Sequence, residues 1–105
     1  MITIDPHTHM NPALLDRVLR HINIIRADHN AEPLTAIKPG TPRNACCCPI
    51  TESLRDLLPD MHCQTGGYNT RFYTNHMCQD ARHTIPLTAP MQAFIAAFDR
   101  IGAVI

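Results

Sequence analysis

The sequence predicts an α+β fold, a small single domain over residues 1–105 with about three helices packed on a short antiparallel sheet or hairpin. Hydrophobic residues make up 45% of the chain and charged residues 17%, which is a globular composition. Two segments repeat apolar residues at helical spacing, and a segment between them is typical of a β-hairpin. A chain of 105 residues can bury one modest core.

The N-terminal part predicts a short strand followed by a long helix. Residues 1–5, "MITID", alternate Ile2 and Ile4 with polar residues, which favours a strand. The helix begins after Asn11, because Asn11 can cap free backbone N–H groups and Pro12 suits the first helical position. An apolar stripe follows at helical spacing, comprising Leu14, Leu15, Val18, Leu19, Ile22 and Ile25.

A proline-rich loop and a second helix come next. The loop spans residues 31–45 and contains Pro33, Pro39, Gly40 and Pro42. Pro49 suits the first turn of a helix of about ten residues, which Pro59 ends. One face of this helix carries Ile50, Leu54, Leu57 and Leu58.

Residues 61–74, "MHCQTGGYNTRFYT", predict the hairpin, with Gly66 and Gly67 supplying the positive φ angles of a tight turn. Side chains alternate between the faces of a strand, so only one of Phe72 and Tyr73 should be buried.

The C-terminal part predicts an edge strand and a last helix. Residues 83–88, "HTIPLT", favour a short edge strand because Pro86 cannot donate a hydrogen bond to a neighbouring strand. A third helix over residues 89–102 should end at Gly102. Its apolar stripe comprises Met91, Phe94, Ile95, Phe98 and Ile101.

Charge and composition narrow the function classes. Nine basic residues balance nine acidic ones, which argues against direct nucleic-acid binding because the chain lacks a global positive field. The sequence shows neither a secretory signal pattern nor a run of about 18 apolar residues, so we expect an unexported protein that does not bind a membrane. Five cysteines, three of them adjacent, are an unusual basis for a secreted disulfide framework and favour the reducing cytoplasm.

The cysteines allow two interpretations. The simpler one is that Cys48 begins the second helix while Cys46 or Cys47 packs against the core, since cysteine is often buried as a small hydrophobe. The alternative is a zinc-stapled structural or interaction module, in which four ligands bind the metal tetrahedrally. Its candidate ligands are Cys46, Cys48, Cys63, His76 and Cys78. These residues lack zinc-knuckle spacing, so we expect no cofactor, with zinc as the alternative.

Two catalytic hypotheses are weaker. "IDPHTH", residues 4–9, resembles the first-strand motif of the amidohydrolase superfamily, which implies a metal-dependent hydrolase using His7 and His9. That family takes further ligands from a barrel that 105 residues cannot form, so both histidines are better explained as turn residues. We therefore expect that the protein is not an enzyme.

A cysteine nucleophile is the second catalytic hypothesis. The helix dipole would lower the pKa of Cys47 or Cys48 at the start of the second helix. The base would be His62, His76 or His83. No local signature of a known nucleophile family surrounds the cysteines, which again favours a noncatalytic protein.

Two segments together resemble a family. "CPITESLRDLLP", residues 48–59, and "IPLTAPMQAFIAAFDRIGAVI", residues 85–105, resemble small uncharacterised phage and prophage-type proteins with a Cys-Pro-Ile/Val helix start and a C-terminal Phe-Ile-x-x-Phe-Asp helix. They cover about a third of the chain. The resemblance implies a noncatalytic phage or mobile-element protein in the host cytoplasm that binds a host protein or nucleoprotein complex. An inhibitor of a defence complex such as a CRISPR nuclease, an anti-CRISPR-like protein, is the specific expectation.

Four arginines are the candidate partner-binding residues. Arg17, Arg20 and Arg26 fall on or near the polar side of the first helix, and Arg43 falls in the proline-rich loop. The simpler interpretation is a solvated helix face, on which Asp16 pairs with Arg20. Six large apolar residues on the first helix also leave homodimerisation open.

Overall fold

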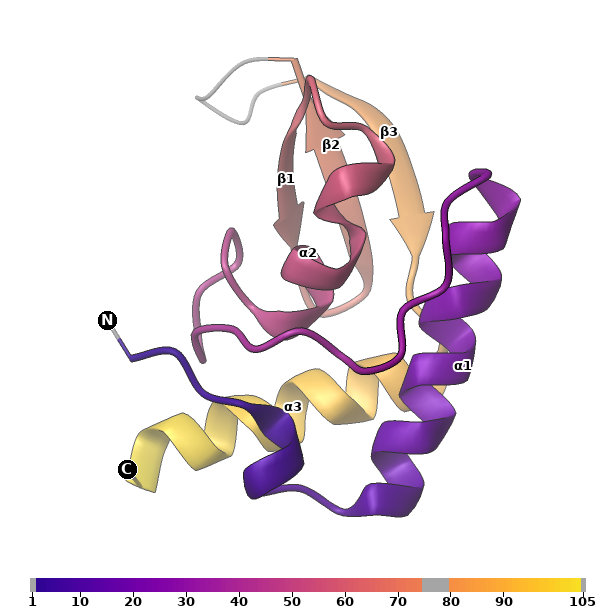
Figure 1. Ribbon diagram of the computed structural model, residues 1–105. Helices are drawn as coiled ribbons and strands as arrows, with labels where there is room; N and C mark the ends of the chain where they lie inside the picture. The colour runs from indigo at the N-terminus through magenta and orange to yellow at the C-terminus, as the bar shows by residue number, and fades with distance from the viewer. Residues whose placement is uncertain (1, 75–79, 105) are drawn as a thin grey trace.

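The computed structural model describes residues 2–74 and 80–104 and confirms the α+β fold (Figure 1). The helices are α1 (Pro12–Asp28), α2 (Pro49–Leu54) and α3 (Ala89–Val104), with 3-10 turns η1 (Pro6–Thr8) and η2 (Arg55–Leu57). Strands β1 (His62–Thr65), β2 (Asn69–Tyr73) and β3 (Ala81–Pro86) form an antiparallel sheet in the order β1-β2-β3. Helix α2 lies against one face of the sheet, and α1 and α3 pack against each other at its end.

Helix α1 has a defined cap at each end, as the sequence predicts for its start. The side chain of Asn11 accepts a hydrogen bond from the backbone N–H of Ala13, at 2.8 Å. At the other end Asn30 adopts a positive φ of 59°, and the N–H of Ala31 donates to the carbonyl of Arg26 at 2.9 Å. This is a Schellman motif, which satisfies carbonyls that the helix end would otherwise leave unpaired.

The helices supply most of the core. Phe94 and Phe98 of α3 stack with ring centroids 5.8 Å apart. The main cluster also contains Leu15, Val18, Ile22, Ile50, Leu54 and Met91. A smaller cluster of Cys63, Phe72 and Ile85 lies on the sheet face that α2 covers. The apolar stripes of the sequence therefore predict most of the buried helix positions.

The sheet has one buried and one open face. Cys63 lies opposite Phe72, and Thr65 opposite Thr70; all four are buried. Between them along the strands, Arg71 is exposed. Strand β3 is an edge strand that ends at Pro86, as expected.

The predicted N-terminal strand is wrong. Residues 2–5 make one isolated bridge, in which Ile4 N donates to Gly40 O at 2.8 Å and Gly40 N to Ile4 O at 3.1 Å. The next hydrogen-bonded pairs of an antiparallel ladder would place Ile2 opposite Pro42 and Pro6 opposite Lys38. Neither proline has an N–H group to donate, so the ladder stops after one pair.

Two expectations for the hairpin are also wrong. Phe72 and Tyr73 are both buried although they belong to opposite faces of β2: Phe72 packs in the small apolar cluster, and Tyr73 lines the same hollow as Asn69 and Arg71. Gly66 and Gly67 do not adopt positive φ angles. They belong instead to a three-residue connection, closed by a hydrogen bond from Gly66 N to Asn69 O at 2.9 Å.

Gly102 does not end the third helix, which continues to Val104. A Cβ at this position would overlap the side chain of Pro42. Gly102 therefore provides the space in which the proline-rich loop packs against α3, and its role is close approach instead of termination.

Candidate binding surface

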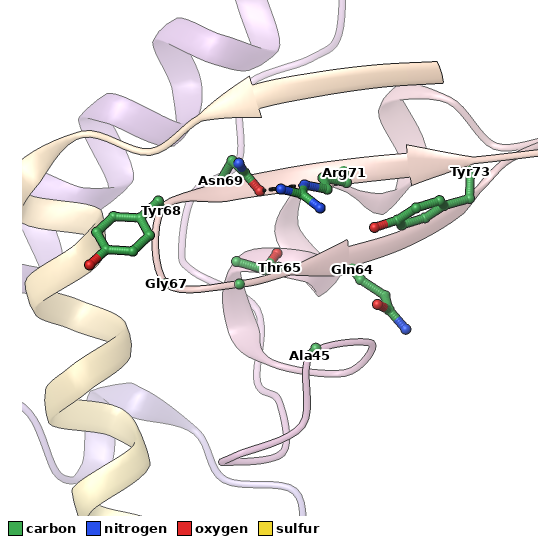
Figure 2. Close-up of a pocket in the computed structure, with 9 residues that line it drawn as sticks. Ala45, Gln64, Thr65, Gly67, Tyr68, Asn69, Arg71 and Tyr73 are labelled. Atoms are coloured by element: carbon green, nitrogen blue, oxygen red, sulfur yellow. Dashed lines mark hydrogen bonds between the residues drawn. The ribbon is translucent and has the colours of Figure 1, made fainter. Parts of the chain in front are cut away.

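The hairpin surface is the feature that we identify as the candidate site. It consists of Gln64, Tyr68, Asn69, Arg71 and Tyr73, and together with Ala45 it lines a hollow of about 270 Å³ (Figure 2). Tyr68 sits at the turn with 77% of its surface exposed. Arg71 is exposed further along β2, and its Nε–H donates to Asn69 Oδ1 at 3.1 Å.

Buried hydroxyl groups fasten this surface to the cysteine loop, residues 43–48. The N–H of Thr65 donates to Ala45 O at 2.9 Å, and Thr51 Oγ1 donates to the same carbonyl at 2.7 Å. The hydroxyls of Thr51, Thr65 and Thr70 then follow one another at 2.7 and 2.9 Å. Each hydroxyl has one proton, so Thr70 donates to Thr65, Thr65 to Thr51, and Thr51 to Ala45.

A second hollow, of about 260 Å³, also borders the turn glycines. Ala45, Thr65, Gly66 and Gly67 line both hollows. The second is completed by residues from the cysteine loop and α3: Arg43, Asn44, Cys48, Ile95 and Asp99. The hairpin turn therefore borders two hollows, and Ala45 of the cysteine loop lines both of them.

The four candidate arginines do not form one surface. Arg17 and Arg20 are exposed on α1. Arg43 is exposed in the cysteine loop, where its backbone N–H donates to Asp99 Oδ1 of α3 at 2.8 Å and its φ is 54°. Arg26 is only 3% exposed, so its assignment to a partner-binding surface is wrong.

Arg26 is buried because it joins three segments of the chain. Its Nε donates to Glu32 O at 2.6 Å and its Nη1 to Ser53 O at 2.9 Å. The guanidinium also forms a bidentate ion pair with Asp56, at 2.6 and 3.0 Å. The hydrogen bond from Arg26 lowers the pKa of the Asp56 carboxyl. Helical spacing placed Arg26 on α1 but could not show that it packs under η2.

The burial of the three adjacent cysteines differs from the prediction. Cys48 begins α2, as predicted, and is itself a buried member of the core. Cys46 is exposed and Cys47 is half-buried, so the expectation that one of them fills the core is wrong. Cys48, the N-cap residue of α2, takes that place.

The proposed zinc ligands are only partly described. Cys48 and Cys63 are buried and Cys46 is exposed, whereas His76 and Cys78 lie outside the described residues. Within residues 2–74 and 80–102, no three His, Cys, Asp or Glu side chains are grouped so that they could hold a metal ion. His7, one of the hydrolase candidates, places Nδ1 2.9 Å from Asp5 Oδ1, and Asp5 caps η1. The exposed His9 follows this turn.

Cys47 and Cys63 do not have the lowered pKa expected of a nucleophile. The pKa of Cys47 is raised, chiefly by a hydrogen bond with Cys46, whereas the helix-start argument predicted a lowered value. Burial raises the pKa of Cys63 to about 12. Of the proposed bases, His83 places Nε2 2.9 Å from His29 Nε2, and His76 lies outside the described residues.

No family model, curated protein or solved structure matches the chain. The resemblance of residues 48–59 and 85–105 to phage-type proteins therefore stays a hypothesis. In the part of the chain that the structure describes, no helix is both long enough and apolar enough to span a lipid bilayer.

Sequence reasoning missed the hairpin surface. It identified the hairpin but assigned no role to Tyr68, Asn69 or Arg71. The signal was available in "GGYNTR", where a large aromatic residue directly follows two turn glycines and so must lie at the tip. An aromatic residue at a turn has few neighbours to cover it, which the 77% exposure of Tyr68 confirms.

Proposed function

We propose that the protein is a noncatalytic binding domain whose hairpin surface contacts a host protein, alone or within a nucleoprotein complex. The observation that carries this proposal is Tyr68, a large aromatic residue that is 77% exposed at the tip of a fastened hairpin. The sequence resemblance adds the class of partner, a component of a host defence complex, and the class of protein, a phage or mobile-element inhibitor.

The chemistry of the surface favours a protein partner. Binding hot spots are enriched in tryptophan, tyrosine and arginine, and Tyr68 and Arg71 lie on the turn and on strand β2 of one hairpin. The hydrogen bond to Asn69 orients the Arg71 guanidinium, which suits recognition of a carboxylate on the partner. The neutral net charge of the chain gives no general attraction to nucleic acid.

The hairpin is also organised before binding. The bond from Thr65 N to Ala45 O and the row of threonine hydroxyls fix the base of the turn against α2. A surface that is already ordered loses little conformational entropy on association. The backbone that carries Tyr68 is therefore already ordered before a partner binds.

The test compares variants of the hairpin surface with variants of α1. A tagged chain is expressed in bacteria, and the partner that it captures is identified by mass spectrometry and purified. We expect Tyr68→Ala and Arg71→Ala each to weaken binding to that purified partner by tenfold or more in calorimetry, as hot-spot residues do. The matched controls, Arg17→Ala and Arg20→Ala on α1, should leave affinity within twofold.

The reverse pattern would contradict the proposal. If the α1 variants abolish binding and the hairpin variants do not, the partner contacts the arginines of α1. Circular dichroism of each variant ensures that only folded proteins are compared.

A further inference from the structure

Cys46 and Cys47 form a pair of neighbouring thiols that the proposed binding function does not use. Their sulfur atoms are 3.2 Å apart, and Cys46 Sγ is also 3.0 Å from Asn44 Oδ1. The amide oxygen can only accept, so the Cys46 thiol donates to Asn44 and the Cys47 thiol donates to Cys46. Cys46 is exposed and Cys47 half-buried, so reagents in solution can reach the pair.

The backbone holds both thiols in place. Cys47 N donates to Asn44 O at 3.2 Å, and Thr41 N donates to Cys47 O at 2.8 Å. The guanidinium of Arg55 donates to Cys46 O and forms an ion pair with Glu52 at 2.7 Å. The two sulfurs are thus kept together by bonds on both sides of the Cys46–Cys47 peptide, so a reaction between them is intramolecular.

We propose that Cys46 and Cys47 are a reversible oxidation site, at which a small-molecule disulfide converts the two thiols into a disulfide between adjacent residues. The Cys46 thiolate attacks one sulfur of the small disulfide, forms a mixed disulfide and releases the first small thiolate. The Cys47 thiolate then attacks Cys46 Sγ and releases the second. Two protons and two electrons leave the protein, and the cleaved small disulfide takes them up as two thiols.

The order of attack follows from the surroundings of the two thiols. Cys46 is the more exposed, and the pKa of Cys47 is raised by the hydrogen bond that it makes to Cys46. Cys46 is therefore the better first nucleophile, and Cys47 is the resolving thiol next to it.

The bond should be easy to reduce. Neighbouring Cα atoms are about 3.8 Å apart across a trans peptide, whereas the cysteines of ordinary disulfides have Cα atoms about 4.4–6.8 Å apart. A ring closed over one peptide is strained, and strained, exposed disulfides have more oxidising potentials. In reducing surroundings the pair returns to two thiols, so the site responds to oxidation without being permanently locked.

The other described cysteines are protected from this reaction. Cys48 is 5% and Cys63 2% exposed, and burial raises the Cys63 pKa to about 12, so its thiolate is scarce at neutral pH. Selectivity for Cys46 and Cys47 follows from accessibility and proximity together.

Formation of the Cys46–Cys47 disulfide should change the structure at the base of the hairpin turn. The peptide that must twist carries Cys46 O and Cys47 N, which bond to Arg55 and Asn44 respectively. The preceding residue, Ala45, accepts the hydrogen bond from Thr65 N at the base of the turn. We expect oxidation to loosen this bond, with faster amide exchange at Thr65 as the readout.

The experiment uses the full chain in a Cys78→Ser background, equilibrated with reduced and oxidised glutathione at several ratios. We expect a loss of two hydrogens, located by fragmentation to the peptide containing Cys46 and Cys47 and reversed by dithiothreitol. Cys46→Ser and Cys47→Ser should each abolish that loss, and Cys47→Ser should accumulate a glutathione adduct on Cys46. Amide exchange at Thr65 should rise several-fold in the oxidised parent and stay unchanged in Cys46→Ser.

Three outcomes would overturn the proposal. They are stable glutathione adducts on both thiols of the parent, a disulfide that includes Cys48 or Cys63, and a disulfide-linked dimer. A two-hydrogen loss without faster exchange at Thr65 would retain the oxidation site and refute its connection to the hairpin.

Discussion

The helical core and the hairpin with its cysteine loop are held together by different forces. Helices α1 and α3 bury aliphatic and aromatic side chains against each other, so apolar area stabilises that half. The hairpin has a small apolar cluster of Cys63, Phe72 and Ile85 and depends on a row of threonine hydroxyls for its attachment. A region fastened by directional hydrogen bonds can leave Tyr68 exposed without losing its shape, which suits binding.

The largest expected effect on the free energy of unfolding comes from substituting Arg26, the polar residue that joins α1 to η2. Arg26→Ala should destabilise the fold by about 3 kcal/mol, because Ser53 O loses its charged donor in a buried site. The half-exposed Asp56 can be rehydrated, which keeps the cost moderate. Urea denaturation measures the change, and Arg20→Ala on the exposed face of α1 should stay within about 0.5 kcal/mol. Equal effects of the two variants would contradict the role of Arg26.

Substitutions of two glycines compare the proline-rich loop, which contains Gly40, with the hairpin turn, which contains Gly67. Gly40→Ala should cost about 2–3 kcal/mol, because its Cβ would lie 2.6 Å from Cys48 C and 2.7 Å from Cys47 O, which are backbone atoms that cannot move aside. Gly67→Ala should leave the stability of the fold unchanged or raise it by up to about 1 kcal/mol. The added Cβ would have no atom from another part of the chain within 4 Å, and the φ of Gly67 is not positive. Thermal unfolding of both variants measures the difference. A destabilised Gly67→Ala would show that the turn is more constrained than the described contacts indicate.

The row of hydroxyl groups of Thr51, Thr65 and Thr70 can be interrupted at Thr51. Thr51→Val keeps the shape of the side chain but removes the hydrogen bond that Thr51 donates to Ala45 O and the one that it accepts from Thr65, so we expect a loss of about 1–2 kcal/mol. Amide exchange at Thr65 should increase more than exchange in α1. Thr84→Val, at an exposed position of β3, is the matched control and should change stability by less than about 0.5 kcal/mol. Uniform exchange across both halves would mean that the two regions unfold as one unit.

The smallest expected effect is the contribution of Asp56 to the pH dependence of stability. Hydrogen bonding to Arg26 lowers the folded-state pKa of Asp56 below its unfolded value of about 3.9, so its contribution to stability is present above that value and is lost as the pH falls through the folded pKa. Unfolding free energies at pH 7 and pH 3 should therefore differ less in Asp56→Asn than in the parent protein. Asp5, whose pKa is also lowered, by its bonds to His7, remains in both proteins and cancels in the comparison. An unchanged pH dependence would contradict the assignment.

The elements that depend on neighbouring residues were predictable. Asn11 and Pro12 mark the start of α1 and Pro49 that of α2, because capping and the missing proline N–H act within one turn of chain. The hairpin and the edge strand β3 follow from local turn and strand preferences. The candidate site was not predictable to the same degree, since Arg26 was assigned to the surface and Tyr68 was given no role.

The sequence by itself determined the fold class, the helix starts, the apolar stripes and the hairpin, since each follows from interactions between residues close along the chain. Only the tertiary structure decided what depends on distant segments. Pro42 against α3 determines that Gly102 is a point of close contact instead of a helix end, and Asp56 determines that Arg26 is buried. The burial of a side chain depends on which segments cover it, and periodicity along one segment carries no information about that.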